Sequence, residues 1–202
     1  MGDVSITLER AVATTAASEA STARRARAIV EEHIDFIWRS LRQLGVAEAD
    51  VDDAVQQVFV VATQKLDRIT PGAERSYVYS VALRVAARAR RSRDRRREAT
   101  DPGLLRHPDP APDPEEVVAR RQALALLDEI LDEMPLALRA VFTLYELEEV
   151  NVPDIAAMLG IPVGTAASRL RRAREDFQAR AREIERTSPV SKRYGACPGG
   201  MR

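Results

Sequence analysis

The side chains in this sequence that could do chemistry are mainly arginines, and they gather in two stretches. Residues 84–97 contain eight arginines and one acid, and residues 169–182 contain six arginines and two acids. A guanidinium group binds phosphate oxygens and the edge of guanine through paired hydrogen bonds. A solvated surface of balanced charge is the alternative, but acids are too few in either stretch to balance it. The pattern therefore indicates binding of nucleic acid.

Four arginines of the first stretch follow the spacing of one helix face. Arg84, Arg88, Arg91 and Arg95 step by four, three and four residues, so in a helix they form a single stripe. Such a stripe can follow the phosphates of a nucleic-acid strand. The formal net charge of zero argues against this when taken alone. Acids gather between the two basic stretches, however, so the neutral average hides two basic surfaces.

Residues typical of a catalytic or metal site form no pattern in this sequence. There is no glycine-rich phosphate loop and no HExxH motif, and the two histidines, His33 and His107, stand far apart. Cys197 is the only cysteine, which excludes an intrachain disulfide and a zinc site built from cysteines. We therefore expect a protein that is not an enzyme and needs no metal or cofactor.

The composition is that of a folded, soluble chain, with 45% hydrophobic and 31% charged residues. No apolar run approaches the roughly 20 residues that a membrane-spanning helix requires. The start of the chain is rich in Ala, Thr and Ser and lacks the apolar core of a signal peptide. We therefore expect no membrane insertion and a cytoplasmic location.

Helices must position the first basic stretch, because apolar residues recur around it at steps of three and four. In residues 28–44 the apolar residues are Val30, Ile34, Ile37, Trp38, Leu41 and Leu44. In residues 50–66 they are Val51, Val55, Val58, Phe59, Ala62 and Leu66. Gly45 is a plausible stop for the first helix, and Asp50 is well placed to cap the second. Residues 66–76 hold a Pro-Gly pair and predict a loop, and a third helix follows from Tyr77 to about Glu98.

A proline-rich segment divides the chain. Residues 99–116 contain five prolines and predict an extended linker. Helical spacing returns in residues 117–134, 138–145, 153–159 and 163–182, and no strand signal is present. The sequence thus predicts an all-α protein with two small helical domains, residues 24–98 and 117–186. Residues 1–23 are expected to be poorly ordered and residues 187–202 to form a loose tail.

Residues 152–174 have the layout of a helix-turn-helix, with a short amphipathic helix, a turn and a basic second helix. Gly160 fits the left-handed position that ends the first helix, and Ile161 can fill the angle between the two. One face of the second helix, predicted to be buried, holds Ala166, Leu170, Ala173 and Phe177. The opposite face holds Thr165, Ser168, Arg169 and Arg172, which could reach DNA in the major groove. An arginine-rich solvated helix in an ordinary helical hairpin is the alternative.

The second half of the chain resembles a known family, the extracytoplasmic-function sigma factors of bacterial RNA polymerase. The segment LDEMPLALRAVFTLYELEEVNVPDIAAMLGIPVGTAASRLRRAR, residues 131–174, is similar to the fourth conserved region of that family, including its Met-Pro helix break and the Gly164-Thr165 start of its recognition helix. In the family this helix reads the minus-35 promoter element. The resemblance implies a set of residues at or near minus-35 DNA, namely Thr165, Ala167, Ser168, Arg169, Arg171 and Arg172.

The first half resembles the same family in two places. DVDDAVQQVFV, residues 50–60, is similar to the helix that docks on the clamp coiled coil of core RNA polymerase, which implies a docking set of Asp50, Asp52, Asp53, Gln56, Gln57 and Val60. RSYVYSVALRVAARARR, residues 75–91, is similar to the helix that recognises the minus-10 element. In the family, the loop before this helix captures a base flipped out of the melted strand. The implied minus-10 set is Asp67, Arg68, Arg75, Arg84, Arg88, Arg91 and Arg95.

Four positions depart from the family pattern. Tyr77 stands where a Trp is usual, Arg84 and Arg88 replace the usual Asn and the frequent Asp, and Ala167 stands where Lys or Arg is common. A protein with these residues is expected to have unusual minus-10 and minus-35 preferences.

The resemblance implies an alternative sigma factor that binds core RNA polymerase and directs promoter-specific transcription initiation. The implied partners are the polymerase, promoter DNA in duplex and melted form, and an anti-sigma factor. Two alternatives stay open. The chain could be a sigma-like adaptor that binds an anti-sigma protein without initiating transcription, or a helix-turn-helix repressor that binds duplex DNA alone.

Overall fold

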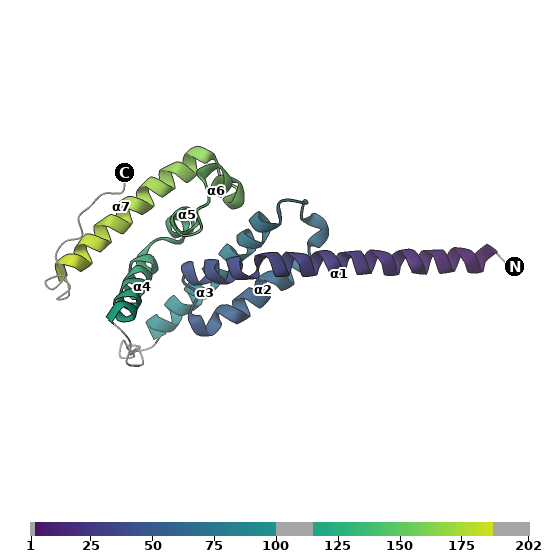
Figure 1. Ribbon diagram of the computed structural model, residues 1–202, viewed down its shortest axis with the longest axis horizontal. Helices are drawn as coiled ribbons and strands as arrows, with labels where there is room; N and C mark the ends of the chain where they lie inside the picture. Colours follow the sequence, from purple (N-terminus) through teal and green to yellow (C-terminus); the bar gives the residue numbers. More distant parts are fainter. Residues whose placement is uncertain (1–2, 100–114, 188–202) are drawn as a thin grey trace. The chain divides into compact units, whose positions relative to one another are not determined.

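The computed structural model describes residues 3–99 and 115–187 of the chain, and in these ranges every regular element is a helix (Figure 1). The chain divides into two compact units, residues 1–42 with 46–96, and residues 97–202 with the short segment 43–45. The prediction of an all-α fold is confirmed for the described residues. The proline-rich stretch 100–114 and residues 188–202 lie outside the described residues. The structure therefore does not test the expected linker and tail.

Helix α1, Asp3–Gln43, is much longer than its apolar spacing predicts. The helix begins at Asp3 rather than near residue 28, so it runs through most of the segment expected to be poorly ordered. The physical reason is composition, because residues 3–28 contain no Gly or Pro and eight Ala, the best helix former. At the other end Gly45 has a positive φ of 92°, and the Val46 N–H bonds the Leu41 carbonyl at 3.0 Å, so the predicted stop is confirmed.

The buried face of α1 differs from the predicted one. Ile37, Leu41 and Leu44 are fully buried, but Ile34 and Trp38 are each 40% exposed. Ile29, His33 and Phe36 are buried in their place, and the Phe36 ring lies 5.8 Å from that of Tyr79. Ile34 and Trp38 each follow a buried residue by one position, which in a helix is a rotation of about 100°. The apolar stripe is therefore wider than the core that covers it.

The first unit is completed by two short 3₁₀ turns, η1 (Glu48–Asp50) and η2 (Leu66–Arg68), and by helices α2 (Val51–Thr63) and α3 (Glu74–Ala99). Asp50 holds the N-cap position of α2, but its side chain makes no capping hydrogen bond. Its backbone is already helical, at φ −108° and ψ −5°, because η1 runs directly into α2. The apolar residues predicted for α2 are all buried, namely Val51, Val55, Val58, Phe59, Ala62 and Leu66.

The second unit contains α4 (Glu115–Glu133), α5 (Leu136–Glu146), α6 (Val152–Leu159) and α7 (Val163–Thr187). Its core includes Leu131, Met134, Phe142 and Ala173, and the Phe142 and Phe177 rings stack with centroids 5.0 Å apart. Helix α7 packs against both α5 and α6. It ends five residues later than predicted, since residues 183–187 contain no helix breaker.

No helix among residues 3–99 and 115–187 is long and apolar enough to cross a membrane. The same residues contain no cluster of three or more His, Cys, Asp or Glu side chains that could hold a metal ion.

Candidate functional site

The turn between α6 and α7 has the geometry of a helix-turn-helix. Asn151 caps α6, since its side-chain oxygen accepts a hydrogen bond from the Asp154 N–H at 2.9 Å. Gly160 ends α6 in the left-handed conformation, with φ 63° and ψ 39°, and the Ile161 N–H bonds the Ala156 carbonyl at 3.0 Å. The predicted left-handed glycine is confirmed. The turn fixes how α7 projects from the unit.

Helix α7 buries one face and exposes another, as its spacing predicts. Ala166, Leu170 and Ala173 are buried, and Phe177 is half-buried. The six residues expected near minus-35 DNA are all at least partly accessible: Ala167, Ser168, Arg171 and Arg172 are exposed, and Thr165 and Arg169 are half-buried. An exposed helix face of this kind can enter the major groove of DNA, which admits an α-helix.

Arginines on α7 differ in their existing partners. Arg171 pairs with Glu175 at 2.7 Å, one turn along the helix. Arg174 pairs with Glu146 of α5 at 2.6 Å and lies 4.7 Å from the Tyr145 ring centroid. The hydrogen bond that Arg174 donates to Glu146 raises the pKa of Arg174 above its ordinary value. Arg172 makes no ion pair with any described residue, so its guanidinium remains available to a ligand.

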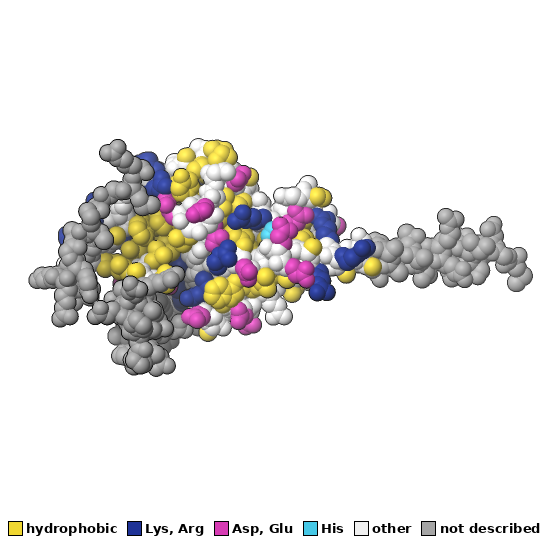
Figure 2. All heavy atoms as spheres, in the orientation of Figure 1, with side chains coloured by type: hydrophobic (Ala, Val, Ile, Leu, Met, Phe, Trp, Pro, Cys, Tyr) yellow, Lys and Arg dark blue, Asp and Glu magenta, His cyan; other side chains and the backbone are white. Residues whose placement is uncertain are grey.

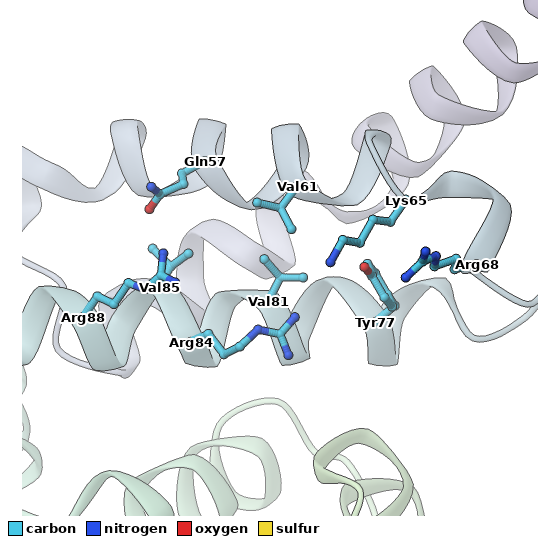
Figure 3. A pocket seen from close by; sticks show the side chains of 9 residues that line it. All are labelled: Gln57, Val61, Lys65, Arg68, Tyr77, Val81, Arg84, Val85 and Arg88. Carbon is cyan, nitrogen blue, oxygen red and sulfur yellow. The ribbon is translucent and has the colours of Figure 1, made fainter.

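A groove lies between α2 and α3 in the first unit, with a volume of about 490 Å³ (Figure 3). Its lining is apolar at Val61, Val81 and Val85 and aromatic at Tyr77. The rest of the lining is polar or cationic, namely Gln57, Lys65, Arg68, Arg84 and Arg88. Among the described residues, no acid lines the groove. A cationic groove with an aromatic ring can hold the phosphates and stack the bases of a single nucleic-acid strand.

The arginine stripe of α3 leads away from this groove. Arg84, Arg88, Arg91 and Arg95 are all exposed, as predicted, whereas Arg90 and Arg93 of the same stretch are half-buried. Arg75, also expected near minus-10 DNA, is exposed and lies 4.3 Å from the centroid of the Phe36 ring. The helix thus divides its arginines between a solvent-facing stripe and more enclosed positions.

The loop formed by residues 66–74 lies at the end of the groove. Its buried residues are Leu66 and Ile69, and its exposed ones are Asp67, Arg68, Thr70, Pro71 and Gly72. Gly72 has a positive φ of 86°, which an L side chain rarely adopts. Arg25 of α1 binds this loop from outside the predicted site, and sequence reasoning missed it. The only available signal was a group of three arginines, Arg24, Arg25 and Arg27, within an alanine-rich segment, and it does not single out Arg25.

The exposed face of α2 carries the residues expected to dock on polymerase. Asp52, Asp53, Gln56 and Gln57 are exposed, Val60 is 47% exposed, and Asp50 is exposed in η1. Gln57 also lines the groove toward α3. Val60 was predicted to lie away from the core, and this is confirmed.

Helix α1 contributes two residues beside this face that sequence reasoning assigned to the core. The Trp38 Nε1–H donates a hydrogen bond to Asp52 Oδ1 at 3.1 Å, and Ile34 lies one turn before Trp38. On the face drawn in Figure 2, apolar and acidic side chains both reach the surface over α1 and α2. An exposed tryptophan is typical of a protein interface, where aromatic residues are enriched.

Two family models match the chain. The model described as "Sigma-70 region 2" matches residues 29–96, and the model described as "Sigma-70, region 4" matches residues 124–177. The groove, the arginine stripe and the exposed face of α2 fall within the first match. The helix-turn-helix falls within the second.

Curated proteins that are similar in sequence to this chain are named RNA polymerase sigma factors. The RNA polymerase sigma factor CnrH of Cupriavidus metallidurans is 32% identical over 159 residues, which cover 75% of this chain and 83% of CnrH. The ECF RNA polymerase sigma factor SigE of Mycolicibacterium smegmatis is 27% identical over 74% of this chain, and the match spans 59% of SigE. The ECF RNA polymerase sigma-E factor of Escherichia coli K12 is 27% identical over 70% of this chain and 78% of its own length.

Solved structures with the same fold include two such proteins with partners. CnrH in complex with the cytosolic domain of CnrY aligns with a TM-score of 0.60 and 26% identity, covering 83% of this chain and 96% of CnrH. The sigma factor RpoE of Bartonella quintana, in complex with the anti-sigma factor NepR, aligns with a TM-score of 0.57. At 19% identity this second likeness shows the fold alone; it covers 76% of this chain and 94% of RpoE.

Proposed function

The chain belongs to the extracytoplasmic-function family of RNA polymerase sigma factors, and we propose that it directs transcription initiation through three surfaces. These are the exposed face of α2 for core polymerase, the groove and stripe of α3 for the minus-10 region, and the exposed face of α7 for the minus-35 element. One observation carries the proposal. A single chain combines a cationic groove suited to one DNA strand with a helix-turn-helix suited to a duplex.

The second unit supports the reading of duplex DNA. Its recognition helix presents Ser168 and Arg172 on an exposed face, and the capped turn at Gly160 fixes the direction of that helix. Arginine bonds guanine through two acceptors in the major groove, and serine bonds bases or phosphates. We assign the six residues on this face, from Thr165 to Arg172, to the minus-35 element.

The first unit supports the holding of melted DNA. The groove offers four cations and the Tyr77 ring, and the stripe beyond it adds Arg91 and Arg95. Phosphates of the displaced strand can pair with the cations while a base stacks on the ring. Asp67 and Arg68, on the exposed part of the 66–74 loop, are assigned to capture of a flipped base.

Polymerase binding is assigned to α2 together with the adjoining part of α1. The acids and amides of α2 give polar contacts. Val60 of α2 and two large apolar side chains of α1, Ile34 and Trp38, give apolar area. Tryptophan is enriched among the residues that dominate binding energy at interfaces. Residues 99–116 are proposed to link the two DNA-binding parts by passing through the polymerase.

The departures from the family pattern concern the groove directly. Arg84 and Arg88 both line it, so guanidinium groups stand where an amide and a carboxylate are usual. A guanidinium donates hydrogen bonds but accepts none. The groove is therefore suited to phosphate or guanine rather than to a base that must donate, such as cytosine through its amino group. Ala167 adds no charge to the exposed face of α7.

Regulation by an anti-sigma factor is proposed from two solved relatives. CnrH was solved with the cytosolic domain of CnrY, and RpoE of Bartonella quintana with the anti-sigma factor NepR. We propose that a comparable partner binds this chain and competes with polymerase. A sigma factor of this kind acts on polymerase in the bacterial cytoplasm and catalyses no reaction itself.

The test is run-off transcription with purified core polymerase on a library of genomic templates, without an inhibitor present. Promoter-specific transcripts that depend on the full-length chain are expected. A variant with Arg169→Ala and Arg172→Ala should lose them while still competing for core polymerase. A chain that binds an anti-sigma protein but never starts a transcript would be an adaptor instead. Tight sequence-specific binding of duplex DNA without polymerase would indicate a repressor.

A further inference from the structure

We propose that Arg25 is a positioning residue that holds the loop of residues 66–74 in the shape required for base capture. The inference rests on the proposed function, because it concerns the loop assigned to the melted strand. Arg25 lies on α1, before the first residue matched by the family model for region 2, at 29. It belongs to none of the three surfaces described above.

The Arg25 guanidinium contacts the loop at three points. Nη1 donates to the Leu66 carbonyl at 3.2 Å, and Nη2 donates to the Ile69 carbonyl at 2.5 Å. Nη2 also lies 3.2 Å from Oε1 of Glu74, with which it forms an ion pair. Leu66 and Ile69 are the two buried residues of the loop, at 5% and 3% exposure. A single side chain therefore ties the start, the middle and the end of the loop together.

Glu74 extends this network to the glycine of the loop. Its Oε2 accepts a hydrogen bond from the Gly72 N–H at 2.6 Å, and Gly72 is the residue with positive φ. Hydrogen bonds to the carboxylate from its own backbone and from Arg25 outweigh desolvation and hold the pKa of Glu74 below its ordinary value of 4.5. The carboxylate thus contributes fully above its ordinary pKa, and its contribution is lost as the pH falls through the lowered pKa.

The contacts leave the binding side of the loop open. Asp67, Arg68, Thr70 and Pro71 are exposed, while the backbone beneath them is held by Arg25 and by the burial of Leu66 and Ile69. A loop that is already ordered loses less conformational entropy when it binds, which favours affinity. Arginine suits this role because its planar fork can bond several acceptors at once, whereas lysine presents a compact charge.

The first experiment measures coupling between Arg25 and the captured base. Open-complex stability is measured on promoters that carry an abasic site at each non-template minus-10 position in turn. The holoenzymes contain the wild-type chain, Arg25→Ala, Arg25→Lys or Arg27→Ala. Arg27 is the matched control, since it is exposed on the same helix and pairs only with Glu31 among the described residues. The abasic position with the largest wild-type loss identifies the captured base.

The expected result is non-additive. Arg25→Ala should weaken open complexes on intact promoter by about tenfold, the value of one charge-assisted hydrogen bond. The abasic site should then reduce open-complex stability much less in this variant than in the wild type, because the loop no longer presents its base site. Arg25→Lys should resemble Arg25→Ala, and Arg27→Ala should keep the wild-type abasic loss. An equal abasic loss in wild type and Arg25→Ala would overturn the proposal.

The second experiment follows the Glu74 carboxyl carbon by NMR as the pH is lowered, in the full-length chain without polymerase. The pKa of Glu74 should rise toward its ordinary value in Arg25→Ala and stay unchanged in Arg27→Ala. An unchanged pKa in Arg25→Ala would overturn the network itself. Failure of the Arg25 network and failure of the proposed function can be told apart. A wild-type chain that starts no promoter-specific transcript would overturn the proposed function, and with it the DNA role of Arg25, whatever the titration shows.

Discussion

At the scale of single residues, arginines in the two basic stretches differ in what already holds them. Arg171 and Arg174 are each paired with a glutamate, at 2.7 and 2.6 Å, whereas Arg172 has no such partner among the described residues. An arginine that must first leave an ion pair gains less from a new ligand. Arg172 is therefore a better candidate than Arg171 or Arg174 for direct contact with a base.

Arg172→Ala should cost about 1–3 kcal/mol of promoter binding by holoenzyme if the guanidinium bonds a base edge. The loss should be confined to promoters that carry the recognised base pair. Fluorescence anisotropy on the promoter duplex and on duplexes substituted at each minus-35 position measures both effects. Arg171→Ala is the matched control, with a smaller expected loss because its side chain already pairs with Glu175. A loss equal on all sequences would assign Arg172 to a phosphate instead.

Glu149 is the one described residue other than glycine with a positive φ, at 54°. A side chain in the left-handed region crowds the following carbonyl oxygen, at a cost of roughly 1–2 kcal/mol. Glu149→Gly should therefore stabilise the chain by about 1 kcal/mol, since glycine accepts this φ but adds entropy to the unfolded state. Urea denaturation gives the difference.

Glu149→Ala separates the backbone effect from the loss of a carboxylate. Alanine removes the charge but keeps the Cβ atom that causes the crowding, so its stability should stay close to that of wild type. Equal gains from Gly and Ala would contradict the conformational explanation and indicate that the charge itself is unfavourable.

At the scale of helices, periodicity was sufficient to find the helices but not to orient each one. The core residues of α2 and α7 were predicted well, because their apolar residues match the width of the face that is buried. In α1 the stripe also includes Ile34 and Trp38, but the tertiary packing buries Phe36 instead, with its ring beside that of Tyr79. The contact of Arg25 with the 66–74 loop joins residues more than 40 positions apart, which no local pattern predicts.

Ile37 and Trp38 provide a direct test of the orientation of α1. They are neighbours in sequence and both fit the apolar spacing, yet Ile37 is 0% exposed and Trp38 is 40% exposed. Ile37→Ala should lower the free energy of unfolding by about 2–5 kcal/mol, as for a buried aliphatic side chain. Trp38→Ala should cost much less stability, because the ring is already partly in solvent. Thermal and urea denaturation of the two variants measure this difference.

Binding to core polymerase should show the reverse order. Trp38→Ala removes an aromatic side chain from the proposed docking face and should weaken binding by about tenfold or more. A folded Ile37 variant, such as Ile37→Val, should bind as the wild type does. Trp38 is the single tryptophan of the chain, so fluorine labelling of tryptophan reports its environment on binding. A fluorine signal unchanged by polymerase would remove Trp38 from the docking face.

At the scale of the whole molecule, a formal net charge of zero is compatible with DNA binding because the charges are unevenly distributed. Exposed arginines lie along α3 and α7, and exposed acids lie on α2. Basic and acidic surfaces suit different partners. A chain of zero net charge can therefore bind an anionic strand through its basic surfaces and a protein through its acidic one. Net charge alone argues against DNA binding. The position of each charge on a helix face predicts DNA binding despite the zero sum.

The salt dependence of DNA binding tests this separation of surfaces. Each phosphate contact to a single strand contributes about 0.7 to the slope of log affinity against log salt concentration. Arg88→Ala with Arg91→Ala should therefore lower the slope for holoenzyme on a pre-melted promoter by about 1.4. A matched pair, Arg24→Ala with Arg27→Ala, removes two charges from α1 outside the stripe and should leave the slope unchanged. Equal changes in both pairs would mean that overall charge, rather than the α3 stripe, attracts the strand.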